Sequence, residues 1–289
     1  MLGYQHIYHA GNFADVYKHA LLVKVLSSMK SKHPSLFLLD THAGRGLYDF
    51  ESPEAQKTLE FHNGIHAVLK GKTADPLISD YLSLVEKYNT GGDVRNYPGS
   101  PKIAADILRK SDKLVFAELH PVEFESLQKN FRGIANINTI KKDGFQVMAE
   151  MLPPEERQGV VVIDPSYEMK TDYAQLPVSV NKAYKKWPRG VFFIWYPILS
   201  SQKHREMLTA LRQSEARNIL VGEIKLDSIP KEGFAMYGTG IAIVNPPIDK
   251  ATAEDITRNI AKSLPMKAFS DVYWLDNQKI NQDTGLVES

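Results

Sequence analysis

Residues 35–46, SLFLLDTHAGRG, decide the fold class of this 289-residue chain. The first six form a short apolar run that ends in Asp40 and lacks the alternation of a half-exposed strand. Such a run predicts a strand covered on both faces, as in parallel sheets. Gly44 and Gly46 follow in a loop of small residues, through which the backbone can approach a nucleotide cofactor closely. The loop matches the Gly-x-Gly-x-x-Gly fingerprint poorly, so a plain strand-to-helix turn explains it equally well.

Similar apolar runs recur along the chain, with segments of helical pattern between them. Further strands are predicted at 113–119, 136–144, 159–164, 190–198, 218–226 and 238–245. Buried strands separated by helices predict a doubly wound α/β fold with a mostly parallel sheet, here of seven strands. The last two runs are joined by only about a dozen residues, which favours a hairpin and hence an antiparallel last strand.

Residues 15–30 are predicted to form a helix, because apolar side chains recur there at the spacing of one helix face. This apolar face consists of Leu22, Val25, Leu26 and Met29. Lys18 and His19 lie one turn before Leu22, at the edge of the same face. We therefore expect both polar side chains to point inward near the start of the helix.

The stretch 49–97 departs from the alternation of strands and helices. It contains helical patterns but no strand pattern, and a turn-rich sequence follows at 91–101. We interpret residues 49–97 as an inserted helical subdomain. The main domain is then expected to comprise residues 1–48 and 98–289.

Composition excludes several classes of protein. The chain is 43% hydrophobic and 24% charged, which is ordinary for a globular protein. It has no cysteine, which excludes disulfides, thiolate metal sites and a cysteine nucleophile. The first dozen residues lack the apolar core of a secretory signal, and no apolar run approaches the roughly 18 residues of a membrane span. We expect a cytoplasmic protein without a membrane partner.

The net charge of +1 gives no global basic field that would attract nucleic acid. Any such partner must be held by a local patch. A cluster of basic residues before the run at 190–198 is one candidate, although solvated helix faces explain it equally well. We expect this cluster to flank the active-site edge and contact phosphates. It consists of Lys182, Lys185, Lys186 and Arg189.

Acidic residues occur at the predicted carboxyl ends of the second and third strands. Glu118 could accept two hydrogen bonds from ribose hydroxyls. Asp143 could hold an adenine amino group, with Phe145 stacked nearby. Each residue alone is explained more simply as a solvated strand end. Together they indicate a nucleotide site, because ligands of open α/β sheets bind at the carboxyl ends of the strands.

The fourth strand ends in Asp164-Pro165-Ser166-Tyr167, the most informative tetrapeptide in the chain. An adenine N6 amine is a weak nucleophile, because its lone pair is delocalised into the ring. The Asp164 carboxylate and the Pro165 carbonyl could bind its two hydrogens and favour a pyramidal nitrogen. Tyr167 could supply a face on which a flipped base stacks. A second tetrapeptide, Asn245-Pro246-Pro247-Ile248, follows the last strand without an aromatic residue, and we interpret it as a strand terminator.

These motifs together resemble the bacterial 23S rRNA adenine-N6 methyltransferases that act on free rRNA. The resemblance covers essentially the whole chain, and the motifs run in the order of that family. They are YQHIYHAGNFADVYKH (4–19), DTHAG (40–44), YPGSP (97–101), ELHP (118–121), DGF (143–145) and DPSYEMKTDY (164–173). The resemblance implies a class I, Rossmann-like methyltransferase fold with a helical insertion and an N-terminal tail that contacts substrate and cofactor.

The resemblance also implies the ligands and their residues. S-adenosylmethionine is the expected methyl donor and S-adenosylhomocysteine the product, with no metal and no obligate protein partner. Asp164 is the expected catalytic carboxylate, assisted by Pro165 and Tyr167, and Tyr4 is expected to contact the RNA. The family usually has a second proline where this chain has Ser166. The expected cofactor residues are Lys18, His19, His42, Ser100, Glu118, Asp143, Gly144 and Asp164.

Two alternatives belong to other classes of function. A metal-dependent nuclease or hydrolase would use some of the histidines, and relatives have been described as needed for the use of external DNA as a nutrient. However, His62 and His66, four residues apart, lack the glutamate of a His-Glu-x-x-His motif. The other alternative is a nucleic-acid-binding protein built on a decayed methyltransferase, for which Ser166 is the only support.

Overall fold

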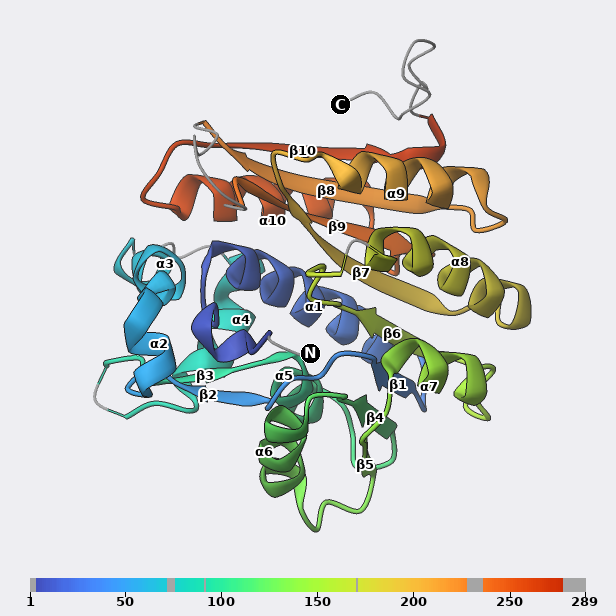
Figure 1. Ribbon diagram of the computed structural model, residues 1–289, viewed down its shortest axis with the longest axis horizontal. Coiled ribbons are helices and arrows are strands. Elements are labelled where there is room, and N and C mark those ends of the chain that lie inside the picture. The colour runs from blue at the N-terminus through green and yellow to red at the C-terminus, as the bar shows by residue number, and fades with distance from the viewer. Residues whose placement is uncertain (1–3, 72–75, 91, 170, 228–235, 278–289) are drawn as a thin grey trace.

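The computed structural model describes residues 4–71, 76–90, 92–169, 171–227 and 236–277 of the chain. An eight-stranded sheet forms its centre, in the order β10-β8-β9-β7-β6-β1-β4-β5 (Figure 1). The strands are β1 (Phe37–Asp40), β4 (Lys113–Ala117), β5 (Ile137–Ile140), β6 (Gly159–Ile163), β7 (Val191–Ile198), β8 (Ile219–Leu226), β9 (Gly238–Val244) and β10 (Ala268–Trp274).

The predicted α/β class and strand directions are confirmed. Strands β5, β4, β1, β6 and β7 pair in parallel, whereas β9 is antiparallel to both β7 and β8. The expected number of strands was wrong, because β10 adds an eighth, antiparallel strand beside β8. Only Val272 is buried in β10, and Phe269 is 53% exposed. An edge strand of this kind has no apolar run by which the sequence could reveal it.

Two layers of helices cover the sheet. One core contains side chains of α1 (Phe13–Lys32), α5 (Ser100–Ile107), α6 (Pro121–Phe131) and α10 (Lys250–Ser263). The other contains side chains of α7 (Gly144–Met151), α8 (Thr171–Lys186) and α9 (Lys203–Gln213). In β1, Leu38 belongs to the first core and Phe37 and Leu39 to the second. Both faces of this strand are therefore apolar, which explains its unbroken hydrophobic sequence.

Helix α1 is covered by other elements along most of its length. Asn12 caps its start by accepting hydrogen bonds from the backbone NH groups of Ala14 and Asp15. The predicted inward orientation of Lys18 and His19 is confirmed, because both side chains are buried. A helix covered on several sides can bring polar side chains into the interior, where they need partners.

Two short strands stand at the ends of the stretch predicted as an insertion, β2 (Leu47–Asp49) at its start and β3 (Asn96–Pro98) at its end. They pair with each other in antiparallel orientation. The expectation of no strand there was wrong, because strands of three residues are too short to show a pattern. Between them lie α2 (Pro53–Thr58), η2 (Glu60–Asn63), α3 (Ile65–Lys70) and α4 (Pro76–Glu86), beside α1 in Figure 1. Their apolar side chains share one core with α1. The assignment of 49–97 as a separate subdomain stays a prediction.

Candidate active site

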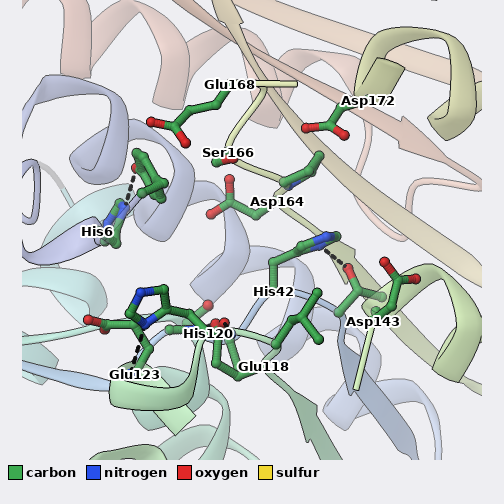
Figure 2. Close-up of a pocket in the computed structure, with 18 of the residues that line it drawn as sticks. His6, His42, Glu118, His120, Glu123, Asp143, Asp164, Ser166, Glu168 and Asp172 are labelled. Carbon is green, nitrogen blue, oxygen red and sulfur yellow. Dashed lines mark hydrogen bonds between the residues drawn. The ribbon is translucent and has the colours of Figure 1, made fainter. Parts of the chain in front are cut away.

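A cavity of about 350 Å³ lies where β1, β4 and β6 end (Figure 2). It is lined by loops that follow these strands, by the start of α7 and by the inward side of α1. The structure brings ten of the predicted site residues together around it. They are Tyr4, Lys18, His19, His42, Ser100, Glu118, Asp143, Gly144, Asp164 and Pro165. Of the predicted set, Tyr167 does not line this cavity.

A buried group of charges ties α1 to the end of β6. The Lys18 ammonium lies 2.6 Å from Asp164 Oδ2 and 2.8 Å from Asp15 Oδ1. Asp15 also accepts hydrogen bonds from His6 Nε2 at 2.8 Å and from the backbone NH of Gly11 at 2.9 Å. Burial alone would lower the pKa of Lys18, but the charges of Asp15 and Asp164 outweigh it and raise the pKa. Lys18 is therefore a permanent cation beside Asp164.

Asp15 is a member of this group that the sequence motifs did not single out. Burial favours its neutral form, but the charges of His6 and Lys18 hold its pKa well below the ordinary value. Asp15 stands three residues before Lys18 on α1, the spacing at which oppositely charged side chains meet on a helix. This spacing is the feature of the sequence from which the ion pair between Asp15 and Lys18 could be predicted.

The first described residues fold against the same group. The Tyr4 hydroxyl lies 2.9 Å from His6 Nδ1, and its ring stacks on His9 at a centroid distance of 5.7 Å. His9 in turn lies 2.8 Å from Glu60, whose hydrogen bond raises the pKa of that imidazole. Figure 2 shows Asp164 between His6 on one side and His42 and Asp143 on the other. The tail thus forms one wall of the cavity.

Glu118, at the end of β4, connects two neighbouring loops. Its Oε2 accepts a hydrogen bond from the NH of Gly44 at 2.8 Å, and its Oε1 accepts one from the NH of His120 at 2.7 Å. Burial raises the pKa of Glu118, although these two NH groups oppose that rise. Each carboxylate oxygen has a second lone pair, so Glu118 can still accept hydrogen bonds from a diol in the cavity.

Close backbone approach explains one predicted glycine. A Cβ atom on Gly144 would lie 1.9 Å from the carbonyl oxygen of Thr41, so the start of α7 can pack there only without a side chain. Asp143 caps the same helix by accepting a hydrogen bond from the NH of Gln146 at 2.9 Å. The loops after β1 and β5 are therefore in direct contact beneath the cavity.

Two cavity histidines are neutral at ordinary pH. Burial lowers the pKa of His42 to about 4 and that of His19 to about 3. His42 Nδ1 lies 2.8 Å from the Thr41 hydroxyl, and its ring meets Phe145 edge-on at 5.3 Å. His19 Nδ1 lies 2.8 Å from the hydroxyl of Tyr97, which fixes the ring. Neither imidazole would repel a cationic ligand.

Asp40, the last residue of β1, is fully buried behind the cavity without lining it. Burial raises the pKa of its carboxyl group to about 7. Its Oδ1 accepts a hydrogen bond from the NH of His42 at 3.3 Å. The sequence places Asp40 at the end of a buried strand, but its complete burial becomes visible only in the structure.

Tyr167 lies differently from the expected open stacking face. Its ring is 6% exposed and packs against Tyr173 at a centroid distance of 4.5 Å. Its hydroxyl donates a hydrogen bond to the carbonyl oxygen of Trp195 at 2.6 Å. The ring borders a second, larger cavity on the other side of Asp164. Its predicted catalytic role, like that of Pro165, stays a prediction.

Asn245 lines neither cavity. Its side-chain NH₂ group donates to the carbonyl oxygens of Pro188 and Gly190 at 2.8 and 2.9 Å, directly after β9. These bonds agree with its interpretation as a strand terminator.

The expected position of the basic cluster was wrong. Thr171, Asp172 and Gln175 at the start of α8 line the cavity, whereas Lys182, Lys185 and Lys186 lie toward its end. Because α8 runs back toward the amino end of β7, the cluster lies about 15–20 Å along the helix from the active-site edge. Lys185 forms an ion pair with Glu215, and the Lys186 ammonium donates a hydrogen bond to the carbonyl oxygen of Ala149.

The histidine pair on the insertion is in contact, since His62 Nδ1 lies 3.2 Å from His66 Nδ1. His66 Nε2 also bonds to the carbonyl of Val94 at 2.9 Å. In the described parts of the chain, no group of three histidine, aspartate or glutamate side chains is placed to hold a metal ion. None of the described helices is long and apolar enough to cross a membrane.

Comparison with known proteins identifies the family. The model of the family described as "Ribosomal RNA large subunit methyltransferase D, RlmJ" matches residues 33–275. The chain belongs to this family. This confirms the family and the methyltransferase fold that the motifs predicted, and membership implies S-adenosylmethionine as the methyl donor.

Individual members of this methyltransferase family are similar over most of their length. Ribosomal RNA large subunit methyltransferase J of Escherichia coli is 37% identical over 248 residues, 86% of this chain and 88% of the relative. The protein of the same name from Haemophilus influenzae is 38% identical over 249 residues, again 86% and 88% of the two chains. A crystal structure of a Legionella pneumophila protein, 32% identical, has a TM-score of 0.85 and covers 92% of this chain and 98% of its own.

Proposed function

We propose that this protein transfers a methyl group from S-adenosylmethionine to N6 of an adenine in free 23S rRNA, with the base flipped out of the RNA. One observation carries the proposal beyond family membership. Asp164 lines both cavities, so a donor in the smaller cavity and a base in the larger one would meet at its carboxylate.

The smaller cavity suits the methyl donor. Glu118 has acceptor capacity for ribose hydroxyls, and Asp143 can accept from an adenine amine. Gly44 and Gly144 line this cavity, so its wall there is backbone without a side chain. His42 and His19 are neutral there, which suits a cationic sulfonium. Bound S-adenosylmethionine would supply an electrophilic methyl group.

The chain's own residues then orient the acceptor. Lys18 holds Oδ2 of Asp164, and the remaining lone pairs of the carboxylate can accept a hydrogen of the adenine amine. The Pro165 carbonyl is the proposed acceptor for the other hydrogen, which would leave the nitrogen lone pair free. Positioning and charge stabilisation of this kind need no covalent enzyme intermediate. Tyr4, which lines both cavities, is the proposed RNA contact of the tail.

The test is transfer of a labelled methyl group to naked 23S rRNA transcript, followed by digestion and nucleoside mass spectrometry. N6-methyladenosine formed by the wild type but not by Asp164→Ala would support the proposal. A 16S rRNA transcript and assembled large subunits provide the specificity controls. A different methylated nucleoside would contradict the assignment of N6. RNA binding without any transfer would favour a binding protein instead.

A further inference from the structure

The larger cavity has a volume of about 770 Å³ and opens on the far side of Asp164 from the donor site. One side is polar and comes from the tail and the insertion, with His9, Asn12, Glu60 and Asn63. The opposite side is apolar, with Trp195, Pro197, Leu199, Leu226, Met236 and Met266. A nucleotide has the same two-sided character, because its base is flat and weakly polar whereas its sugar and phosphate are strongly polar.

Trp195, on β7, is a large aromatic residue of the apolar side, and its side chain is partly exposed. Its indole NH donates to the Thr239 hydroxyl on the neighbouring strand at 2.8 Å. The Tyr167 ring lies beside the indole at a centroid distance of 5.8 Å, and the Tyr167 hydroxyl donates a hydrogen bond to the carbonyl oxygen of Trp195. These contacts fix the indole in one orientation without covering it completely.

Lys18 lies close to both the Trp195 indole and the Asp164 carboxylate. The Lys18 ammonium lies 5.7 Å from the centre of the Trp195 ring and 2.6 Å from Asp164 Oδ2. Trp195 and Asp164 therefore both lie close to the Lys18 ammonium in the lining of one cavity. The indole is therefore within reach of a purine whose amine meets the carboxylate.

We propose that Trp195 is the stacking residue for the flipped adenine and that Tyr167 mainly supports it from behind. The inference rests on the proposed function and adds to it the surface that receives the base. Tyr167 is a poorer platform because its ring is packed on Tyr173 and almost fully buried. Stacking on an aromatic side chain is tolerant of base identity, so Asp164 and Pro165 would still select the amine.

Fluorescence provides a test that does not depend on activity. The chain has three tryptophans, of which Trp187 is buried against Arg157 and Trp274 lies on β10, outside both cavities. In a Trp187→Phe/Trp274→Phe protein, Trp195 is the sole indole emitter. With saturating S-adenosylhomocysteine, adding adenosine monophosphate or the rRNA transcript should quench this emission, and ribose 5-phosphate should not. Adenine ligand bound by calorimetry with unchanged emission would overturn the inference.

Kinetics on the rRNA transcript provide the second test. Trp195→Leu should lower kcat/KM for RNA about tenfold or more, with unchanged affinity for S-adenosylhomocysteine. Trp195→Phe keeps an aromatic face and should recover most of the loss. Trp274→Leu is the matched control at a partly buried tryptophan outside both cavities.

The outcomes separate the two proposals. If the wild type methylates adenine and Trp195→Leu is no slower than Trp274→Leu, the stacking role fails while the proposed function stands. If the wild type methylates no RNA but adenosine monophosphate quenches Trp195, the proposed function fails while base stacking stands. Absence of both transfer and binding would overturn both.

Discussion

Lys18 and Asp164 are 146 residues apart in the sequence, yet their charged atoms lie 2.6 Å apart beneath both cavities. The pair joins the first long helix of the chain to the strand end that carries the proposed catalytic carboxylate. Because Lys18 also contacts Asp15, it neutralises two carboxylates at once. We therefore expect both the stability of the fold and the proposed methyl transfer to depend on this ammonium group.

Lys18→Met should destabilise the protein by about 3–5 kcal/mol, because it leaves two carboxylates in the interior without their cation. Urea unfolding measures the loss. Lys87→Met is the matched control, since the Lys87 side chain is 58% exposed in its pair with Asp106. That surface pair should contribute less than about 1 kcal/mol. Equal losses of unfolding free energy in the two variants would show that the buried ion pairs contribute no more to stability than the exposed pair.

Asp164→Ala should reduce methyl transfer to background while the fold survives, because the buried Lys18 keeps Asp15 as its partner. Asn245→Ala should leave transfer nearly intact but lose about 1–3 kcal/mol of stability. Asn245 has a φ of 54°, which disfavours alanine, and its two hydrogen bonds are lost. Transfer time courses and unfolding curves for both variants measure these effects. Activity that survives in Asp164→Ala but not in Asn245→Ala would move the active site to the other tetrapeptide.

Glu118→Ala should weaken binding of S-adenosylhomocysteine at least about tenfold, because charge-assisted hydrogen bonds to the ribose are lost. Calorimetric titration measures the affinity. Glu125→Ala, on the exposed side of α6, is the control for a general effect of removing a negative charge. Unchanged affinity in a folded Glu118→Ala protein would exclude Glu118 from the ribose site.

Asp40→Asn should be more stable than the wild type at pH 8, and the advantage should shrink as the pH falls toward 4. Burial raises the folded-state pKa of Asp40 to about 7, well above its value in an unfolded chain. Between these two values the folded protein binds a proton that the unfolded chain releases. Its stability should thus fall by up to about 1.4 kcal/mol per pH unit as the pH rises.

Urea unfolding of both proteins from pH 4 to 8 measures this difference. Asp227→Asn provides the same substitution at an exposed position. A stability difference between Asp40→Asn and the wild type that does not change with pH would show that Asp40 is not held neutral by burial.

Tyr167→Phe should reduce stability by about 0.5–1.5 kcal/mol, because the buried carbonyl of Trp195 loses its hydroxyl partner. Thermal unfolding measures the change. Tyr184→Phe, on a partly exposed side chain of α8, is the control. A variant as stable as the wild type would show that the hydroxyl bond contributes little.

Strand ends were the part of this structure that the sequence predicted best. Asp40, Glu118 and Asp164 each follow an unbroken apolar run, whereas Asp143 follows the more polar β5. The parallel sheet brings all four to one edge. Burial on both faces explains that success, because it leaves a pattern in consecutive residues. Local patterns also placed Lys18 and His19 on the inward side of α1.

Features that depend on contacts between distant residues could not be predicted in this way. The buried ring of Tyr167 is set by its packing on Tyr173 and its bond to the Trp195 backbone. The role of Trp195 as a cavity wall depends on the pairing of β7 with β9, two strands that are not adjacent in sequence. The exposed strand β10 lacked an apolar run altogether.

The contacts beneath the donor cavity have a thermodynamic consequence. Glu118 fastens the Gly44 loop to β4, and Gly144 sits directly against the carbonyl of Thr41. Contacts within the protein thus join three strand-end loops into one frame. Association with the methyl donor then requires little loss of backbone conformational entropy, so more of the contact energy remains as affinity. A side chain introduced at position 144 would loosen this frame, and binding would become a coupled ordering process.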